Sequence, residues 1–295
     1  MRPHATVRSF FDPPTGTVSH VVWDRASRRA AVIDPVLDFD LQSGRTSTAS
    51  AEQLLAYLAE QSLTVDWILE THAHADHLSA ARWLHERVGG RVAIGERIRE
   101  VQARFHPLFP FDRDGRPDGS GFDHLFADGE VFRIGELEAR ALWVPGHTPA
   151  DIAYLIDGAA FVGDTLFMPD VGTARADFPG GDARQLYRSV RRLLDLPPDT
   201  VMYVCHDYPP PTRAPAWQTS VAAQRAGNIH VHDGVDEDAF VALRTQRDAT
   251  LEVPALILPS IQVNLRAGRL PPPEDNGVAY LRIPINQLPA TAPHA

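Results

Sequence analysis

The feature that most constrains this 295-residue chain is a cluster of four residues within six positions, all of types that commonly bind metal ions. The cluster is His72-Ala73-His74-Ala75-Asp76-His77, and it follows an apolar segment, residues 65–69, that predicts a short buried strand. Residues 78–88 carry apolar side chains at helical spacing, and Gly89 and Gly90 end that predicted helix. We therefore expect the imidazoles and the carboxylate at a junction between a strand and a helix.

Strand-like and helix-like patterns are interleaved along both halves of the chain. This interleaving favours two sheets packed face to face with helices outside. Strands are expected at residues 18–23, 30–33, 65–69, 92–94, 131–134, 139–144, 152–156, 159–162 and 201–204. Helices are expected from residue 50 and at residues 78–88, 96–105, 183–194, 217–225 and 237–251, with a long loop at 106–123.

Three further motifs each follow a predicted strand. They are Gly146-His147-Thr148, Gly163-Asp164 and His206-Asp207. Since all of them come at strand ends, we expect them to converge with the histidine cluster on one rim of the sheets. Imidazole and carboxylate are ligands that a borderline divalent cation binds, and two or three imidazoles with one carboxylate leave coordination positions open. The sequence therefore predicts a catalytic metal centre.

Composition and charge narrow the range of partners. The chain is 44% hydrophobic and 22% charged, as in ordinary globular proteins, and its length suits one large domain or two small ones. A net charge of −10 disfavours nucleic acid and anionic membranes as partners. With a single cysteine, no signal-peptide pattern and no apolar run near the roughly 20 residues of a membrane span, we expect a cytoplasmic protein.

The motifs together resemble the metallo-β-lactamase superfamily. The resemblance runs from about residue 18 to residue 206 and implies an α/β (α+β) fold, an αββα sandwich of two mixed sheets flanked by helices, with the metal at the sheet edge. We treat residues 1–295 as a single domain and residues 254–295 as a Pro-rich extension packed on it. The apolar residues expected to make this packing are Ile257, Leu258, Ile261, Val263, Leu281 and Ile283.

Within the superfamily the chain is most similar to the persulfide dioxygenases, also called sulfur dioxygenases. The resemblance is carried by residues 163–167, 175–182, 186–189 and 206–208. In that family two histidines and one aspartate hold a single Fe(II). The matching positions here are His72, His147 and Asp164. The resemblance implies oxidation of glutathione persulfide by O₂ and water to sulfite and glutathione, and it suggests a homodimer.

The same residue types would also serve a binuclear zinc hydrolase. His74, Asp76, His77 and His206 are then ligands of a second metal rather than groups that surround a single iron. Glyoxalase II, which hydrolyses a glutathione thioester, has this ligand set and a helical C-terminal domain that grips glutathione. The short Pro-rich tail differs from that domain, so we prefer the dioxygenase. The intact ligand set disfavours a third alternative, a non-catalytic sulfur sensor or partner-binding protein.

Two further residues are expected to bind substrate. Arg175 lies in the family-like segment and could meet a carboxylate of glutathione, or else form a structural ion pair with Asp177 or Asp182. Tyr208 could hydrogen-bond to a metal ligand or to substrate, or else pack under its own loop.

Two residues near the motifs are given mainly structural roles. Cys205 precedes His206 at a strand end, and side-chain alternation predicts that its thiol points away from that histidine, into the core. Asp34 ends an early strand before a proline, where it could support the metal loop or form a turn.

Overall fold

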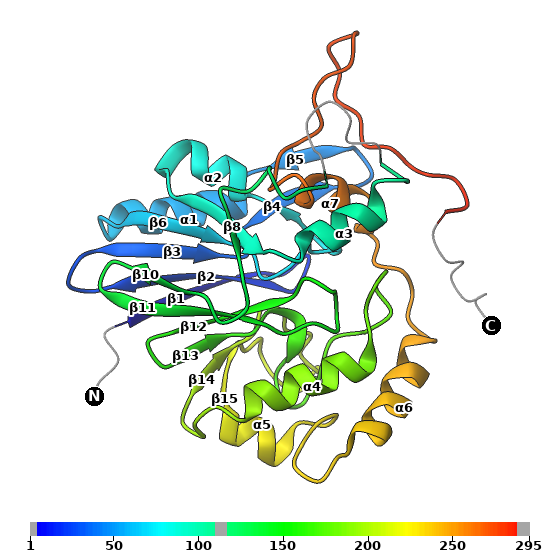
Figure 1. Ribbon diagram of the computed structural model, residues 1–295. Helices are drawn as coiled ribbons and strands as arrows, with labels where there is room; N and C mark the ends of the chain where they lie inside the picture. Colours follow the sequence, from blue (N-terminus) through cyan, green and yellow to red (C-terminus); the bar gives the residue numbers. More distant parts are fainter. Residues whose placement is uncertain (1–4, 110–116, 288–295) are drawn as a thin grey trace.

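The computed structural model describes residues 5–109 and 117–287, and these residues form four layers. Two six-stranded sheets lie face to face, and helices cover the outer face of each sheet (Figure 1). This is the αββα sandwich of mixed sheets that the sequence predicted. Residues 110–116 of the expected loop lie outside the described residues.

The first sheet is mixed. Its first three strands pair antiparallel, and the pairs β3–β6, β6–β8 and β8–β9 are parallel. In spatial order its strands are β1 (Ala5–Asp12), β2 (Thr17–Asp24), β3 (Arg29–Ile33), β6 (Thr64–Leu69), β8 (Arg91–Gly95) and β9 (His124–Phe126).

The second sheet is antiparallel except for its β13–β14 pair. Its strands follow one another in sequence order, with a helix between β13 and β14. They are β10 (Val131–Ile134), β11 (Leu137–Trp143), β12 (Ile152–Ile156), β13 (Ala159–Phe161), β14 (Val201–Tyr203) and β15 (Gln218–Ser220). A small third sheet joins β5 (Arg45–Ser47), β4 (Val36–Asp40) and β7 (Leu78–Ser79).

Burial of apolar side chains holds the four layers together. One core lies between the sheets and includes Ile33, Leu69 and Tyr154. The helices packed on the first sheet are α1 (Ala49–Glu60), α2 (Ala81–Val88), α3 (Ile98–Phe105) and α7 (Ile257–Asn264). Those on the second sheet are α4 (Ala183–Leu194), α5 (Val221–Gly227) and α6 (Glu237–Asp248).

Two predicted helices begin later than the apolar spacing indicated. Residues 78–79 form β7 and pair with β4, so α2 begins at Ala81. Residues 218–220 form β15 and pair with β14, so α5 begins at Val221. In both cases pairing with another strand, rather than the local helical spacing, determines the structure of these residues, because the strand partner supplies backbone hydrogen bonds.

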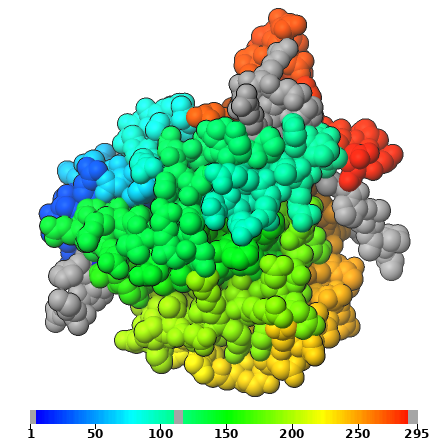
Figure 2. All heavy atoms as spheres, viewed as in Figure 1, coloured from blue at the N-terminus to red at the C-terminus, as the bar shows by residue number. Residues whose placement is uncertain are grey.

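The C-terminal segment after residue 254 has a packed part and an exposed part. Ile261 and Val263 in α7 are fully buried, and Ile257 is 7% exposed. Ile283, by contrast, is 72% exposed, so the expected packing does not extend to it. Figure 2 shows this orange and red end of the chain standing out from the rounded body. Among the described residues, no helix is long and apolar enough to cross a membrane.

Candidate metal centre

The predicted motifs meet at one end of the sandwich. The histidine loop follows β6, His147 follows β11, Asp164 lies in a short 3-10 helix (Gly163–Thr165) after β13, and His206 follows β14. Their ligand atoms form two groups, and within each group all the atoms lie within 4.8 Å of one another. The first group is His72, His147 and Asp164, and the second is His74, Asp76, His77 and His206.

In the first group, two imidazoles face one carboxylate oxygen. The Nε2 atoms of His72 and His147 lie 3.8 Å and 3.5 Å from Oδ2 of Asp164. All three residues are buried. Burial and the neighbouring imidazoles hold the pKa of His72 well below its usual range, so this ring is neutral. A neutral imidazole offers the lone pair that a metal ion requires.

Hydrogen bonds fix which nitrogen of these rings is free. Thr71 Oγ1 donates to Asp34 (2.8 Å), so it accepts from Nδ1 of His72 (3.0 Å). Nδ1 of His147 donates to the carbonyl oxygen of Arg175 (2.8 Å). Nδ1 of each ring therefore donates a hydrogen bond, which leaves Nε2, the atom facing Asp164, as the nitrogen available to a metal ion.

The second group surrounds Asp76. Nε2 of His206 lies 3.2 Å from Asp76 Oδ2, and Nδ1 of His77 lies 3.7 Å from Asp76 Oδ1. The same His206 nitrogen is 3.6 Å from Oδ1 of Asp164. Asp164 therefore stands between the groups, with one oxygen toward each, which is the position of a carboxylate that can bridge two metal sites.

His74 is held by two buried carboxylates. Its Nε2 lies 3.1 Å from Asp34 Oδ1 and 3.4 Å from Glu70 Oε2, and Ser79 donates a further hydrogen bond to Glu70. Burial opposes protonation of His74, but the two carboxylates outweigh it and raise the pKa of His74 well above its usual range. Asp34 thus has the supporting role that was one of its two alternatives.

Both groups have the donors that a metal ion needs. Buried polar atoms normally have a hydrogen-bond partner. Here several ring nitrogens of the two groups have none among the described residues. These atoms are Nε2 of His72, Nδ1 of His74, Nε2 of His77 and both ring nitrogens of His206. Imidazoles and carboxylates are ligands that suit Fe(II) or Zn²⁺.

Two glycines let the strand ends approach one another. Gly146 has φ of 144°, and a Cβ there would lie 2.3 Å from the Cα of Leu186 in α4. Gly163 has φ of 52°, and its Cβ would lie 2.8 Å from the side chain of Thr71. Neither position accepts a side chain without displacing its neighbour, which explains glycine directly before His147 and Asp164.

Two sets of hydrogen bonds fix the loop around His206: one to the first sheet and one to an arginine. Val18 donates its backbone N–H to the carbonyl oxygen of Cys205 (2.7 Å). Arg213 makes two hydrogen bonds of 2.7 and 2.9 Å to the buried Asp207 carboxylate. The Tyr208 ring stacks on the His206 ring, with centroids 5.7 Å apart and planes 5° apart, and it is half-exposed. Tyr208 therefore lies at the surface of the site.

Arg175 makes mostly structural contacts. Its guanidinium donates to both carboxylate oxygens of Asp177 and to the carbonyl oxygen of Glu252. The ion pair with Asp177 is the alternative left open by the sequence. Asp182, the other candidate, instead caps α4 by accepting from the backbone N–H of Gln185.

The expectation for the direction of Cys205 is wrong. Its thiol is buried, but it donates a hydrogen bond to Oδ1 of Asp164 at 2.8 Å. Strand β14 ends at Tyr203, so side-chain alternation no longer governs residue 205. Burial and the nearby carboxylates raise the pKa of the thiol well above its usual range, so Cys205 is a neutral donor.

Sequence reasoning also missed two buried residues that contact the histidine loop. Glu70 lies two positions before His72, and the buried strand that ends at Leu69 gave a usable signal. Asn264 lies far along the chain in α7, where no local pattern marks it.

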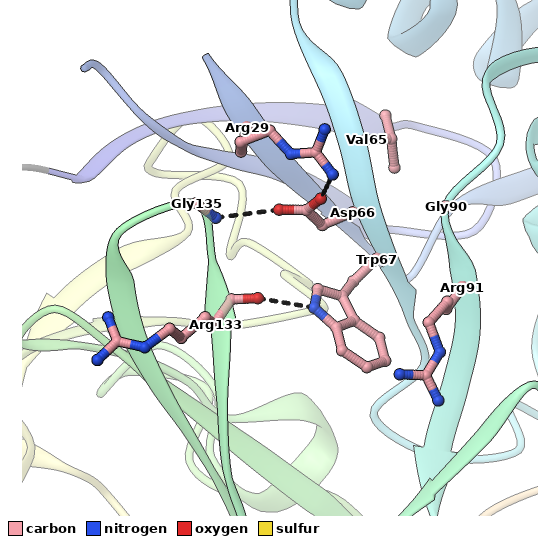
Figure 3. A pocket seen from close by; sticks show the side chains of 8 residues that line it. All are labelled: Arg29, Val65, Asp66, Trp67, Gly90, Arg91, Arg133 and Gly135. Carbon is pink, nitrogen blue, oxygen red and sulfur yellow. Dashed lines mark hydrogen bonds and ion pairs between the residues drawn. The ribbon is translucent and has the colours of Figure 1, made fainter. Parts of the chain in front are cut away.

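Two hollows lie at different places relative to the metal centre: one borders it and the other does not. A groove of about 410 Å³ is lined by His77, by the turn after β1 and by the β4–β5 hairpin. A second hollow of about 630 Å³ lies near the start of β6, at the end away from the histidine loop (Figure 3). There Arg29 pairs with Asp66, and Trp67 donates to the carbonyl oxygen of Arg133 at 2.8 Å. The Trp67 contact joins β6 of the first sheet to β10 at the edge of the second, whereas the Arg29–Asp66 pair lies within the first sheet.

The sequence profile of the metallo-beta-lactamase superfamily matches residues 12–206, which is more than half of the chain. With the sandwich fold and the two donor groups in place, the chain belongs to this superfamily, as its motifs predicted. A probable metallo-hydrolase of Burkholderia pseudomallei is 55% identical over 293 residues, which are 96% of this chain and 100% of that protein. Glyoxylase B2 of Dictyostelium discoideum is 47% identical over 98% of this chain and 99% of its own.

Persulfide dioxygenases are more distant relatives. The mitochondrial persulfide dioxygenase ETHE1 of Homo sapiens is 30% identical over 205 residues, which are 68% of each chain. The crystal structure of ETHE1 from Myxococcus xanthus superimposes with a TM-score of 0.71 at 29% identity, and it covers 90% of this chain and 100% of that one. The predicted resemblance is therefore found, although relatives with hydrolase-like names are more similar in sequence.

Proposed function

We propose that this protein is a mononuclear Fe(II) enzyme that oxidises a persulfide. In the balanced reaction, glutathione persulfide, O₂ and water give glutathione, sulfite and two protons. The observation that carries the proposal is the buried group of His72, His147 and Asp164, because two histidines and one carboxylate are the ligand set of non-haem Fe(II) oxygenases. The similarity to ETHE1 over two thirds of the chain supports this choice.

Iron held by this triad would supply open coordination positions and the redox chemistry between a persulfide sulfur and O₂. Neighbouring residues of the chain orient the side chains that would hold the iron. Thr71 and the Arg175 carbonyl group hold the two imidazoles in one orientation. Under this proposal His74, Asp76, His77 and His206 surround the reacting atoms rather than bind a second metal.

The groove beside His77 is where we place the thiol carrier. Its volume of about 410 Å³ lies within the range of about 300–1,000 Å³ common for small-molecule sites. Arg45 in its wall offers a cation for a carboxylate of glutathione. Tyr208 and Arg175 remain proposed substrate contacts. For Arg175, a substrate carboxylate has to compete with Asp177, which now occupies the guanidinium.

The direct test uses protein loaded anaerobically with Fe(II). On addition of glutathione persulfide we expect O₂ uptake and an equal amount of sulfite. The same preparation is then assayed with a glutathione thioester, and the metal content per chain is measured. No O₂ uptake by the iron-loaded protein, together with two bound zinc ions and thioester hydrolysis, would replace the proposal.

The second candidate is a binuclear zinc hydrolase that acts on a glutathione thioester. Two observations favour it: the four-donor group around Asp76, and the 47% identity to a protein named glyoxylase B2. Under this alternative each group would hold one zinc ion, and Asp164 has one oxygen toward each group. The two candidates differ in metal stoichiometry, so the loss of one donor from the second group separates them.

A further inference from the structure

Asn264, at the end of α7, is bound directly to the histidine loop. Its Nδ2 donates to the carbonyl oxygens of His74 (2.9 Å) and His77 (2.8 Å), and its Oδ1 accepts from the backbone N–H of Ser79 (2.8 Å). The residue is 5% exposed, and both hydrogens of its amide are used. One side chain thus bridges three backbone groups of a loop that lies almost 190 positions earlier.

The packing around this contact is equally close. Val263 is fully buried in the same apolar cluster as Leu78 and Ala80, which follow the histidine loop. Gly268 has φ of 80°, and a Cβ at this position would lie 2.9 Å from the carbonyl oxygen of Ser79. The C-terminal segment therefore meets β7 backbone to backbone, with no space for a side chain between them.

Helix α7 is itself held by the body of the domain. Gln102 in α3 donates to the carbonyl oxygen of Leu265 (2.9 Å), and Ile261 is fully buried in the core outside the first sheet. The superfamily match ends at residue 206. The contact thus comes from a segment beyond the region that defines the superfamily.

We propose that Asn264 is a positioning residue of the metal centre, and that the C-terminal segment completes this centre. Among the described residues, no strand pairs with the loop between β6 and β7. By holding the carbonyl groups of His74 and His77, Asn264 fixes the spacing of two ring-bearing residues of the second group. Partners that orient metal ligands typically change metal affinity about 10- to 100-fold when removed. The role holds for either candidate reaction.

The test compares two substitutions of Asn264 with one control in the same helix. Asn264→Leu removes all three hydrogen bonds at similar volume. Asn264→Asp keeps the acceptor for Ser79 but directs a carboxylate at two carbonyl oxygens. Gln262→Leu is the control, because Gln262 is also 5% exposed and also makes three hydrogen bonds, two with Arg282 and one with Leu258. None of its bonds reaches the histidine loop.

The readouts are Zn²⁺ affinity by competition with a chelator and the visible spectrum of the Co²⁺-loaded protein. We expect both Asn264 variants to bind Zn²⁺ at least about 10-fold more weakly and to change the Co²⁺ spectrum. The control should stay within about twofold. Unchanged affinity and spectrum in folded Asn264→Asp protein would overturn the proposal. So would a metal-free Asn264→Asp protein that melts far below the metal-free control, because the contact then serves general stability.

Discussion

The two donor groups of the metal centre are oriented in different ways. In the first group, neutral acceptors hold the back of each ring: the Thr71 hydroxyl for His72 and the Arg175 carbonyl group for His147. In the second group, two carboxylates, Asp34 and Glu70, hold His74, while the Thr17 hydroxyl lies 3.2 Å from Nδ1 of His77. Among these supports, buried carboxylates therefore contact a ring directly only at His74.

This difference bears on how strongly each group favours a metal ion. In the first group, both Nε2 atoms face one oxygen of Asp164 and the pKa of His72 lies well below its usual range, so a bound cation would balance this carboxylate. In the second group, despite burial, Asp34 and Glu70 raise the pKa of His74 well above its usual range, so a proton on this ring competes with a metal ion. We therefore expect the first group to bind metal more tightly, and the four predictions below test this order.

The largest effect is expected from Asp164, because its two oxygens face both groups. Asp164→Asn removes the negative charge at nearly constant volume. We expect the protein to lose its iron and its activity to fall by more than about 100-fold, beyond the loss typical for a residue that only orients ligands. Metal analysis after gel filtration, alongside the activity assay, measures this. If metal is retained at the native level, Asp164 does not connect the groups.

The next effect separates the groups directly. His147→Ala should remove the iron, whereas His77→Ala should leave close to one iron per chain and reduce activity by about 10-fold. The two residues are similarly buried, so each serves as the other's control for folding. Iron content measured on anaerobically purified proteins decides the outcome. If His77→Ala also loses its metal, both groups are needed and the binuclear hydrolase gains support.

A smaller effect distinguishes two carboxylates behind the rings. Asp34 accepts from Thr71, which supports His72, and from His74, so it serves both groups. Glu70 contacts His74 alone among the histidines. We expect Asp34→Asn to lower metal affinity about 10- to 100-fold and Glu70→Gln to lower it less than about 10-fold. Chelator competition on both variants measures the ratio. Equal losses would mean that the supports of the two groups are not separate.

The sequence predicted the strand ends that carry the candidate ligands more accurately than it predicted the surroundings of these residues. His72, His147 and Asp164 each follow an apolar run, and such runs form strands whose ends meet when the sheets pack. The contacts of Asn264 and the strand β7 depend on partners more than 40 positions away, which local spacing does not encode. The prediction that the Cys205 thiol points away from His206 failed for a related reason, because side-chain alternation applies only while the strand continues.

The smallest effect is expected from Cys205, which contacts the carboxylate shared by the groups. Its thiol donates to Oδ1 of Asp164, the oxygen that faces His206, while Oδ2 faces the first group. Cys205→Ser keeps a donor and Cys205→Ala removes it. Because a thiol is a weak donor, its hydrogen bond contributes about 1 kcal/mol, and we expect up to about a fivefold loss of metal affinity in the alanine variant.

Recovery in the serine variant would show that the thiol acts as a hydrogen-bond donor to Asp164. Equal losses in both variants would instead point to the volume of the sulfur atom, and no loss in either would remove Cys205 from the site. The Co²⁺-loaded protein adds a second criterion. A sulfur-to-metal charge-transfer band that disappears in Cys205→Ala would make the thiol a ligand of the second group. That group would then favour softer metals than the first.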